Sequence, residues 1–590
     1  MKAAVCSLAL AIGWAQAVYA AAPEVTIDPG GVSPQALQAI VASVNVITRL
    51  AEDQDGGELS RLRRRAREAT LSALETQGYF SPTVVLNVGE DPLGETWDIV
   101  IKSGERTRVD KVALDFSGGI TAPDFHARTD LLKQSWPLTQ GMPFINEEWN
   151  RAKGALIDDV RRKDFYLARV TTSRATIHAD KAQADLHVAI DSGPPVRLGK
   201  VEVIGLKRVP RELIDRYVRY APGQPYSQDQ LDDWQQALQS TSFFRGAFVS
   251  LDSTPAHRVV MPDGDVEMPL QVRVSEAPAR RFSASLGVDS DNGVRGEALY
   301  RQNVVFGKPV WIETGAGADK NRQRAFFDVH FAPDLDGNKD SVGLLLDHSD
   351  IEGVDTRRAG VGWKRIQERK AQAGSRVEYE TKWGLVGAYD KTRVEGAETY
   401  EVPSLVGTWQ WLRRDVDDKY NPREGNLIEL GLGAGVTLDR GEGFYKSGLR
   451  ARQWWPIGEW DVLTLRGEVG KVWSGTSRLP EDFGYRTGGA RTIRGYRYES
   501  IGVSRGSAII GAPALAVASI EYMHYFTQQF GMSVFVDAGD AAESFGAMKM
   551  AVGYGIGALA RTPAGPLEVD LAWAQRDHKL RIHFSMGIAF

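Results

Sequence analysis

The chain ends in LRIHFSMGIAF (580–590), in which large apolar side chains alternate with polar or small ones. One face of this segment would carry Leu580, Ile582, Phe584, Met586, Ile588 and Phe590. The opposite face would carry Arg581, His583, Ser585 and Gly587. A period of two over this length predicts a β-strand long enough to cross a bilayer when it is tilted.

The same alternation of apolar with polar or small residues extends back to Arg281, as in FSASLGV (282–288). We count about sixteen such segments, separated by turns such as NPREGN (421–426) and RTPAGP (561–566). Roughly 19 residues per segment fit a strand of ~10 residues plus its turns. A soluble β-sandwich is the alternative, but its strands average about five or six residues. We therefore predict a 16-stranded antiparallel transmembrane β-barrel over residues 278–590.

The composition excludes some classes of protein. A net charge of -5 over 590 residues gives no basic field for nucleic acid. Residues 1–20 have the form of a secretory signal peptide, with Lys2 before an apolar stretch and small residues at its end. Cys6, the only cysteine, falls inside this signal, so no disulfide is expected in the mature chain.

The first half of the chain repeats itself. IVIKSGERTRV (99–109), VAIDSGPPVRL (188–198) and VRVSEAPARRF (272–282) are strand-like segments that end in similar turns. Each repeat reads strand, helix, helix, strand, strand. We therefore place three α+β units at residues 21–104, 105–193 and 194–277. The basic run RLRRRARE (61–68) is interpreted as a solvated helix face.

The longest predicted loop, residues 474–512, contains GGARTIRGYRYES (488–500). Arginines recur there every third residue, at 491, 494 and 497, but the interspersed glycines weaken any helix. Arg491 and Arg497 are interpreted as ordinary polar loop residues. Arg494 is the residue whose environment needs an explanation.

Two strands after this loop supply acidic residues. In ALAVASIEYMHYF (514–526) the alternation turns Glu521 inward, and in GMSVFVDAGD (531–540) it does the same for Asp537. Two carboxylates on consecutive strands form a plausible receptor for a guanidinium that folds back into the barrel. The sequence thus predicts an internal ion-pair site.

Other motif-like stretches do not indicate chemistry. GLGAGV (431–436) and GYGIGA (553–558) lie inside predicted strands, with no following helix to bind a phosphate. GVSRG (502–506) matches a hydrolase elbow around Ser504 but lacks the strand-turn-helix context. No cluster of histidine and cysteine suggests a metal site. We expect no enzymatic activity, cofactor or metal.

IRGY (493–496) together with FVDAG (535–539) resembles the paired signature of the outer-membrane barrel assembly superfamily. That family includes BamA-type and TamA-type proteins and two-partner secretion transporters. GPLEVDLAWA (565–574) resembles its penultimate strand, and the three repeats resemble POTRA (polypeptide-transport-associated) domains. The resemblance implies a loop lock made of Arg494, Gly495, Tyr496, Glu521, Phe535, Asp537 and Gly539.

Three POTRA units and this length resemble the TamA type within the superfamily. The resemblance implies a non-enzymatic insertase of the Gram-negative outer membrane with periplasmic POTRA units. Its implied partners are a TamB-like periplasmic protein, unfolded outer-membrane protein or autotransporter clients, and membrane lipid. Alternatives are a two-partner transporter for one exoprotein, a loop-gated passive channel, and repeats that act only as spacers.

An insertase of this kind requires a barrel whose closure is weak. The seam must join RRFSASLGV (280–288) to the final strand, and glycines in both strands weaken pairing. An open seam would present an edge that a client strand can extend. The predicted seam residues are Phe282, Ser285, Gly287, Phe584, Gly587 and Phe590.

Overall fold

The computed structural model describes residues 22–589 apart from 53, 55, 92–93, 372–373, 477 and 563–564. The expected signal peptide, with Cys6, and Phe590 lie outside the described residues. The chain divides into two compact units, and the division runs through the third of three small N-terminal domains. None of the described helices is both long and apolar enough to cross a membrane.

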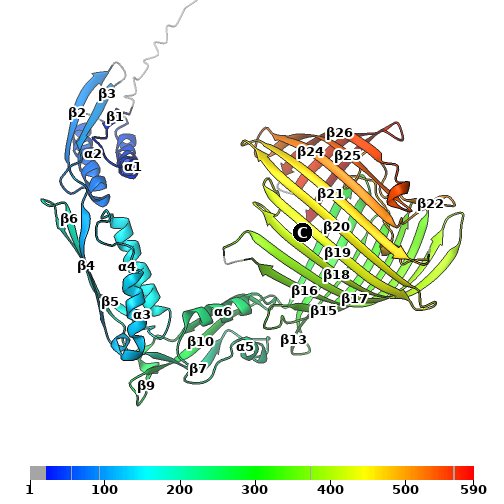
Figure 1. Cartoon of the computed structure of the whole chain (residues 1–590), viewed down its shortest axis with the longest axis horizontal. Helices are drawn as coiled ribbons and strands as arrows, with labels where there is room; N and C mark the ends of the chain where they lie inside the picture. The colour runs from blue at the N-terminus through cyan, green and yellow to red at the C-terminus, as the bar shows by residue number, and fades with distance from the viewer. Residues whose placement is uncertain are drawn as a thin grey trace, which may run out of the picture. The chain divides into compact units, whose positions relative to one another are not determined.

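Three α+β domains precede the barrel (Figure 1). The first contains β1 Glu24–Asp28, α1 Pro34–Leu50, α2 Gly56–Thr76, β2 Thr83–Asp91 and β3 Gly94–Lys102. The second contains β4 Arg108–Ser117, η1 Gly119–Thr121, η2 Pro123–Phe125, α3 His126–Gln134, α4 Asn146–Arg161, β5 Arg169–His178 and β6 Gln183–Asp191. The third contains β7 Val196–Ile204, α5 Glu212–Tyr217, α6 Gln228–Gln239, β8 Phe244–Leu251, η3 Pro255–His257, β9 Val259–Val260 and β10 Val266–Glu276.

Each small domain places its last long strand in the middle of a sheet. The sheet orders are β1-β3-β2, β4-β6-β5 and β7-β10-β8. Apolar residues of the helices and of the central strand form the core, as Ile40 and Ile99 do in the first domain. In each domain, the strand that follows the helices therefore lies at an edge of the sheet. These edge strands are β2, β5 and β8.

The last strand of the third domain leads directly into the barrel, and Glu276 fixes that junction. Its carboxylate accepts the N–H groups of Lys207, Arg208 and Val209 at 2.6–2.9 Å and the Arg208 side chain at 3.1 Å. Burial opposes ionisation, but these donors outweigh it and lower the pKa of Glu276 to about 2. The junction is therefore held by a charged group.

Sixteen strands form the barrel, which closes where β11 meets β28. The strands are β11 Arg280–Asp289, β12 Gly293–Val305, β13 Lys308–Ala318, β14 Arg322–Phe331, β15 Lys339–Ile351, β16 Val354–Lys370, β17 Val377–Val394, β18 Thr399–Val416, β19 Gly425–Thr437, β20 Gly443–Ile457, β21 Asp461–Ser474, β24 Ala514–Tyr525, β25 Phe530–Ala542, β26 Ala551–Thr562, β27 Gly565–Ala574 and β28 Lys579–Ala589. All neighbouring strands pair antiparallel, from β11–β12 round to β11–β28. The predicted fold class is confirmed.

Alternation along each strand sorts side chains between the lumen and the outer face. On β25, Val534 and Val536 are about half exposed on the outside, at 54% and 46%, whereas Phe535 and Asp537 are buried inside. The glycine runs at 431–436 and 553–558 lie within β19 and β26. Ser504 lies in the short hairpin of β22 Val503–Arg505 and β23 Ala508–Ile510, which is not a hydrolase elbow.

Replacing Glu276 with glutamine should loosen the segment 207–209 from the end of β10, the strand that leads into the barrel. Hydrogen bonds to a charged acceptor contribute about 1.5–3 kcal/mol, so amide exchange at residues 207–209 should accelerate about tenfold or more near neutral pH. Since the pKa of Glu276 lies below its usual 4.5, the carboxylate stabilises the fold fully above that pH and loses this contribution as the pH falls toward 2. The difference between wild type and variant, measured by hydrogen–deuterium exchange, should shrink over that range. A constant difference would contradict the assignment.

Candidate functional site

The loop between β21 and β24 is attached to the barrel along its whole length. Near its start, η4 Glu481–Phe483 packs its Phe483 ring edge-on against Phe444 of the wall, with centroids 4.6 Å apart. Near its end, the β22–β23 hairpin donates backbone hydrogen bonds from Ile509 to Glu352 O and from Ser507 to Glu395 O. Between these anchors lies the segment that contains Arg494.

Arg494 is 7% exposed and is surrounded by carboxylates. Its Nε and Nη2 donate to the two oxygens of Asp537, at 2.8 and 3.1 Å, and its backbone N–H donates to Asp537 at 3.0 Å. Its Nη1 donates to Glu521 at 2.6 Å. The structure therefore brings Arg494 together with Glu521 and Asp537, the two carboxylates that alternation predicted to face inward. The bidentate contact uses the planar fork that only arginine presents.

An aromatic ring completes the binding of this guanidinium. The Arg494 Cζ lies 3.3 Å from the centre of the Phe535 ring, two residues before Asp537 on the same inward face of β25. A cation over the face of an aromatic ring is stabilised further when water is excluded, and Phe535 is 3% exposed. Phe535 thus contributes directly to the site.

Two further charged residues belong to the site and were missed from the sequence. Asp570 of β27 lies 3.5 Å from Arg494 Nη1. Arg466 of β21 lies 3.7 Å from Asp537 and donates to the backbone oxygens of Arg491 and Thr492. Alternation within PLEVDLA (566–572) predicts that Asp570 faces inward, so this residue could have been found from the sequence. The cluster therefore comprises two guanidinium groups and three carboxylates.

Gly495 allows the loop to touch the wall. Its φ is +95°, and a Cβ there would lie 2.9 Å from the backbone nitrogen of Ala574. The next residue, Tyr496, is 2% exposed; its hydroxyl donates to Val552 O at 3.1 Å and accepts the Arg576 N–H at 3.1 Å. Together they fix the loop tip against β26 and β27.

An apolar cluster surrounds these polar contacts inside the lumen. It is made of loop and wall residues: Ile493, Tyr496, Ile501, Ala512, Leu515, Val517, Ala541, Ala551 and Ala574. Apolar packing on this scale excludes water from the loop tip, which strengthens the adjacent ion pairs. Gly539 lies at the edge of this region, where a Cβ would meet Ala516 O at 2.6 Å.

The loop separates two polar cavities in the barrel. One, of about 540 Å³, is lined by loop residues and by the turns near Asp291 and Asp319. The other, of about 550 Å³, is lined by Arg491, Arg494 and wall residues toward Tyr420. Arg491 lines both cavities. Arg497 forms an ion pair with Glu352 at 2.7 Å.

The seam between β11 and β28 is short. Ser285–Asp289 of β11 pair with Ala589–Ser585 of β28, and this register places Gly287 opposite Gly587. By contrast, all ten residues of β11 pair with β12. None of the described β28 residues pairs with Arg280–Ala284, so Phe282, 70% exposed, lies beyond the paired part of the seam. Phe584 lies just past its other end, and Phe590 is outside the described residues.

Replacing Arg494 with alanine should release the loop. The change removes the cation that Asp537, Glu521 and Asp570 share, and breaking a buried pair costs about 3–5 kcal/mol. Protease cleavage within residues 474–512 of the folded barrel should increase strongly. Arg494→Lys should restore little protection because lysine cannot bind two oxygens of Asp537 in one plane. Unchanged cleavage in both variants would contradict this account.

A double-mutant cycle should show that Arg494 and Asp537 act as one unit. Asp537→Asn should increase cleavage less in the Arg494→Ala background than in wild type, because its main partner is already absent. The wall pair Arg301–Glu313, at 2.8 Å on β12 and β13, supplies the control. Arg301→Ala and Asp537→Asn should have additive effects. Additive effects for Arg494 and Asp537 would rule out their direct coupling.

The chain matches three family profiles. Residues 337–590 match the Omp85 superfamily domain, residues 24–102 match POTRA domain TamA domain 1, and residues 196–277 match the POTRA profile described as a surface antigen variable number repeat. These regions correspond to most of the barrel and to the first and third small domains.

Known proteins and structures agree with these matches. The chain is 22% identical over 464 residues to the outer membrane protein assembly factor BamA of Neisseria meningitidis serogroup B. That alignment covers 72% of this chain and 55% of BamA, so the chain spans about half the length of this curated relative.

Among solved structures, the fold matches Haemophilus ducreyi BamA lacking POTRA domains 1–3, with a TM-score of 0.67 and 15% identity over 82% of this chain and all of that one. CdiB from Acinetobacter baumannii matches with a TM-score of 0.44 and 11% identity over 82% of this chain and 90% of CdiB. Residues 337–590 therefore carry an Omp85 superfamily domain preceded by POTRA-type domains, and the protein lies in the Gram-negative outer membrane with its POTRA domains in the periplasm.

Proposed function

We propose that this protein assists the insertion of outer-membrane β-barrel proteins, autotransporters among them, without enzymatic chemistry. The observation that carries the proposal is the short β11–β28 seam: five positions pair, and Arg280–Ala284 pair with none of the β28 residues that the structure describes. The name of the matched Neisseria relative, an outer membrane protein assembly factor, agrees with this activity.

The unpaired part of β11 provides a physical route for insertion. It lies at the end of the strand that follows the third POTRA domain, so it faces the periplasmic side of the barrel. Its backbone N–H and C=O groups can pair with an extended client segment, as an exposed sheet edge does. Only five pairs then separate this partial edge from a fully open one.

The POTRA domains offer further edges to an unfolded client. β2, β5 and β8 are edge strands, and each follows the helices of its domain. β8 exposes Phe248 at 65%, and β2 exposes Val85 at 49%, so these edges present apolar side chains. On β8, Gln239 and Gln235 bond the backbone groups of Ala247 and Val249, which a client strand would have to displace. Such edges favour transient pairing with a client strand over a role as spacers alone.

We also propose a TamA-type identity and a TamB-like periplasmic partner. The match of residues 24–102 to the first POTRA domain of TamA supports this assignment, as does the presence of three small sheets before the barrel. Under this assignment the first POTRA domain, the match that distinguishes the TamA type, is the expected docking region for the partner.

Locking the seam should abolish client assembly while leaving the barrel itself folded. Val288 and Met586 are register partners across the seam, and opposite Cα atoms in antiparallel strands are close enough for a disulfide. The Val288→Cys, Met586→Cys variant should therefore cross-link when oxidised. In cells depleted of the native protein, the locked variant should leave several outer-membrane proteins deficient in a quantitative proteome, and reductant should restore them.

The control keeps the first cysteine and moves the second to the other side of β11. Val288 also pairs with Val294 of β12, so the Val288→Cys, Val294→Cys variant forms a disulfide that leaves the seam free. This control should support normal assembly. Full activity of the seam-locked form would refute lateral insertion. Loss of one exoprotein alone would favour a two-partner transporter, and loss of conductance without proteome changes would favour a channel.

A further inference from the structure

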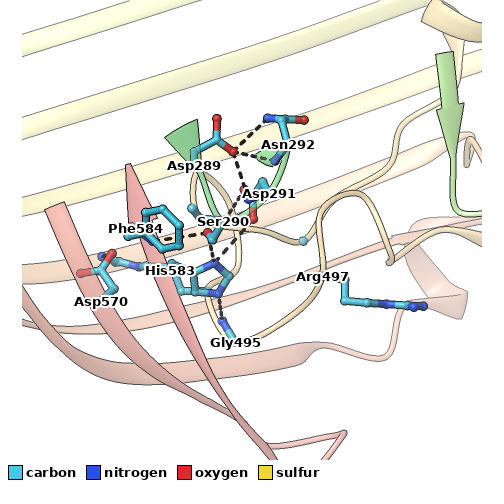
Figure 2. Close-up of polar contacts among 12 residues, drawn as sticks. Asp289, Ser290, Asp291, Asn292, Gly495, Arg497, Asp570, His583 and Phe584 are labelled. Carbon is cyan, nitrogen blue, oxygen red and sulfur yellow. Dashed lines mark hydrogen bonds and ion pairs between the residues drawn. The ribbon is translucent and has the colours of Figure 1, made fainter. Parts of the chain in front are cut away.

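His583 connects the loop tip to the last strand of the barrel. It lies on the lumen face of β28 and is 4% exposed. Its Nε2 accepts the backbone N–H of Gly495 at 2.8 Å (Figure 2). Gly495 directly follows Arg494, which the three carboxylates bind. The loop residue that contacts β28 is therefore the sequence neighbour of the residue that forms the ion pairs.

The second ring nitrogen of His583 faces the first strand of the barrel. Its Nδ1 lies 3.4 Å from Ser290 Oγ and 3.6 Å from Asp291 Oδ1, both in the turn that follows β11 (Figure 2). Because Nε2 accepts a hydrogen bond, the ring proton must be on Nδ1, where it points toward these two oxygens. One neutral imidazole therefore bridges the loop to the β11–β12 turn.

Ser290 extends the seam beyond its regular pairing. Its backbone N–H donates to Phe584 O at 3.0 Å, and its Oγ accepts the Phe584 N–H at 3.3 Å (Figure 2). The hydroxyl thus takes the place of a backbone acceptor at the position next to the Asp289–Ser585 pair. The same hydroxyl is the group that His583 approaches.

Asp291 gives the loop a second contact on the β11 side. Its Oδ2 accepts the backbone N–H of Ala490 at 2.8 Å. The preceding Gly489 lies so close that a Cβ there would be 2.8 Å from the same oxygen, with φ at +102°. The loop therefore contacts both sides of the seam, at β28 through Gly495 and at the β11–β12 turn through Ala490.

We infer that the loop tip clamps the end of the seam that is remote from the POTRA domains, with His583 as a positioning residue and Asp291 as its counterpart across the seam. Arg494 contacts carboxylates of β24, β25 and β27, none of which is a seam strand. Gly495 and Ala490 connect the loop tip that it anchors to the two sides of the seam. Release of the lock and opening of the seam are then one coupled event, whichever cargo the barrel serves.

Hydrogen–deuterium exchange of the full chain, without a client, tests this coupling at seam amides 285–289 and 585–589. His583→Ala should accelerate their exchange about five- to tenfold, which is the effect of losing one or two hydrogen bonds. His583→Gln should exchange nearly as slowly as wild type, since its amide oxygen can replace Nε2 as acceptor. Arg581→Ala, two residues away on the same face, is the matched control and should leave the seam unchanged.

The cycle with Arg494 distinguishes a clamp from a local packing effect. Arg494→Ala alone should accelerate exchange at the seam, and adding His583→Ala should cause little further change. Asp291→Ala, in a turn outside the strands, provides a second test if the histidine variant does not fold, and should accelerate exchange both at the seam and at residues 488–500. Equal effects of His583→Ala and Arg581→Ala, or multiplied effects of His583 and Arg494, would overturn the proposal.

Discussion

The guanidinium of Arg494, bound by three carboxylates and stacked on Phe535, is the interaction on which the interior of the barrel depends. A charge withdrawn from water is tolerated only when opposite charges and hydrogen bonds replace the solvent. Asp537, with no exposed surface, would be strongly unfavourable without Arg494 and Arg466. The loop must therefore enter the lumen if this wall is to be stable, and once inside it packs an apolar cluster around the pair.

The seam between β11 and β28, unlike the Arg494 cluster, is held by backbone hydrogen bonds and not by buried charges. It consists of backbone pairing over five described positions, with glycine facing glycine at its centre. Pairing of this length is weak by itself, since an isolated short ladder in water is marginal. The loop strengthens it through Asp291 and His583, and His583 in turn contacts Ser290. Within the residues that the structure describes, these loop contacts lie at the end of the seam remote from the POTRA domains, so the barrel is closed asymmetrically.

Much of this arrangement could be predicted from the sequence because β-strands alternate. The period of two predicts that Glu521 and Asp537 face inward, whereas the choice of Arg494 as their partner came from the family resemblance of IRGY (493–496) and FVDAG (535–539). The same rule applied to residues 566–572 would have found Asp570. It could not find the partners of His583: its inward direction follows from alternation, but Ser290 and Asp291 become neighbours only through the register in which the barrel closes. That register depends on the stagger summed over all sixteen strands, which no local pattern encodes.

The asymmetry bears on how a barrel can be stable and still open. If closure depended on many backbone hydrogen bonds between β11 and β28, the seam could open gradually. Each of these similar bonds could break and re-form independently. Here the contacts that reinforce the seam belong to one loop, and that loop is held by one cluster of buried charges. Such a cluster does not loosen gradually, because an ion pair that leaves its low-dielectric site loses both its attraction and its neighbours. Under the proposed coupling, release of this cluster would withdraw the loop contacts from the five described pairs of the seam in one step.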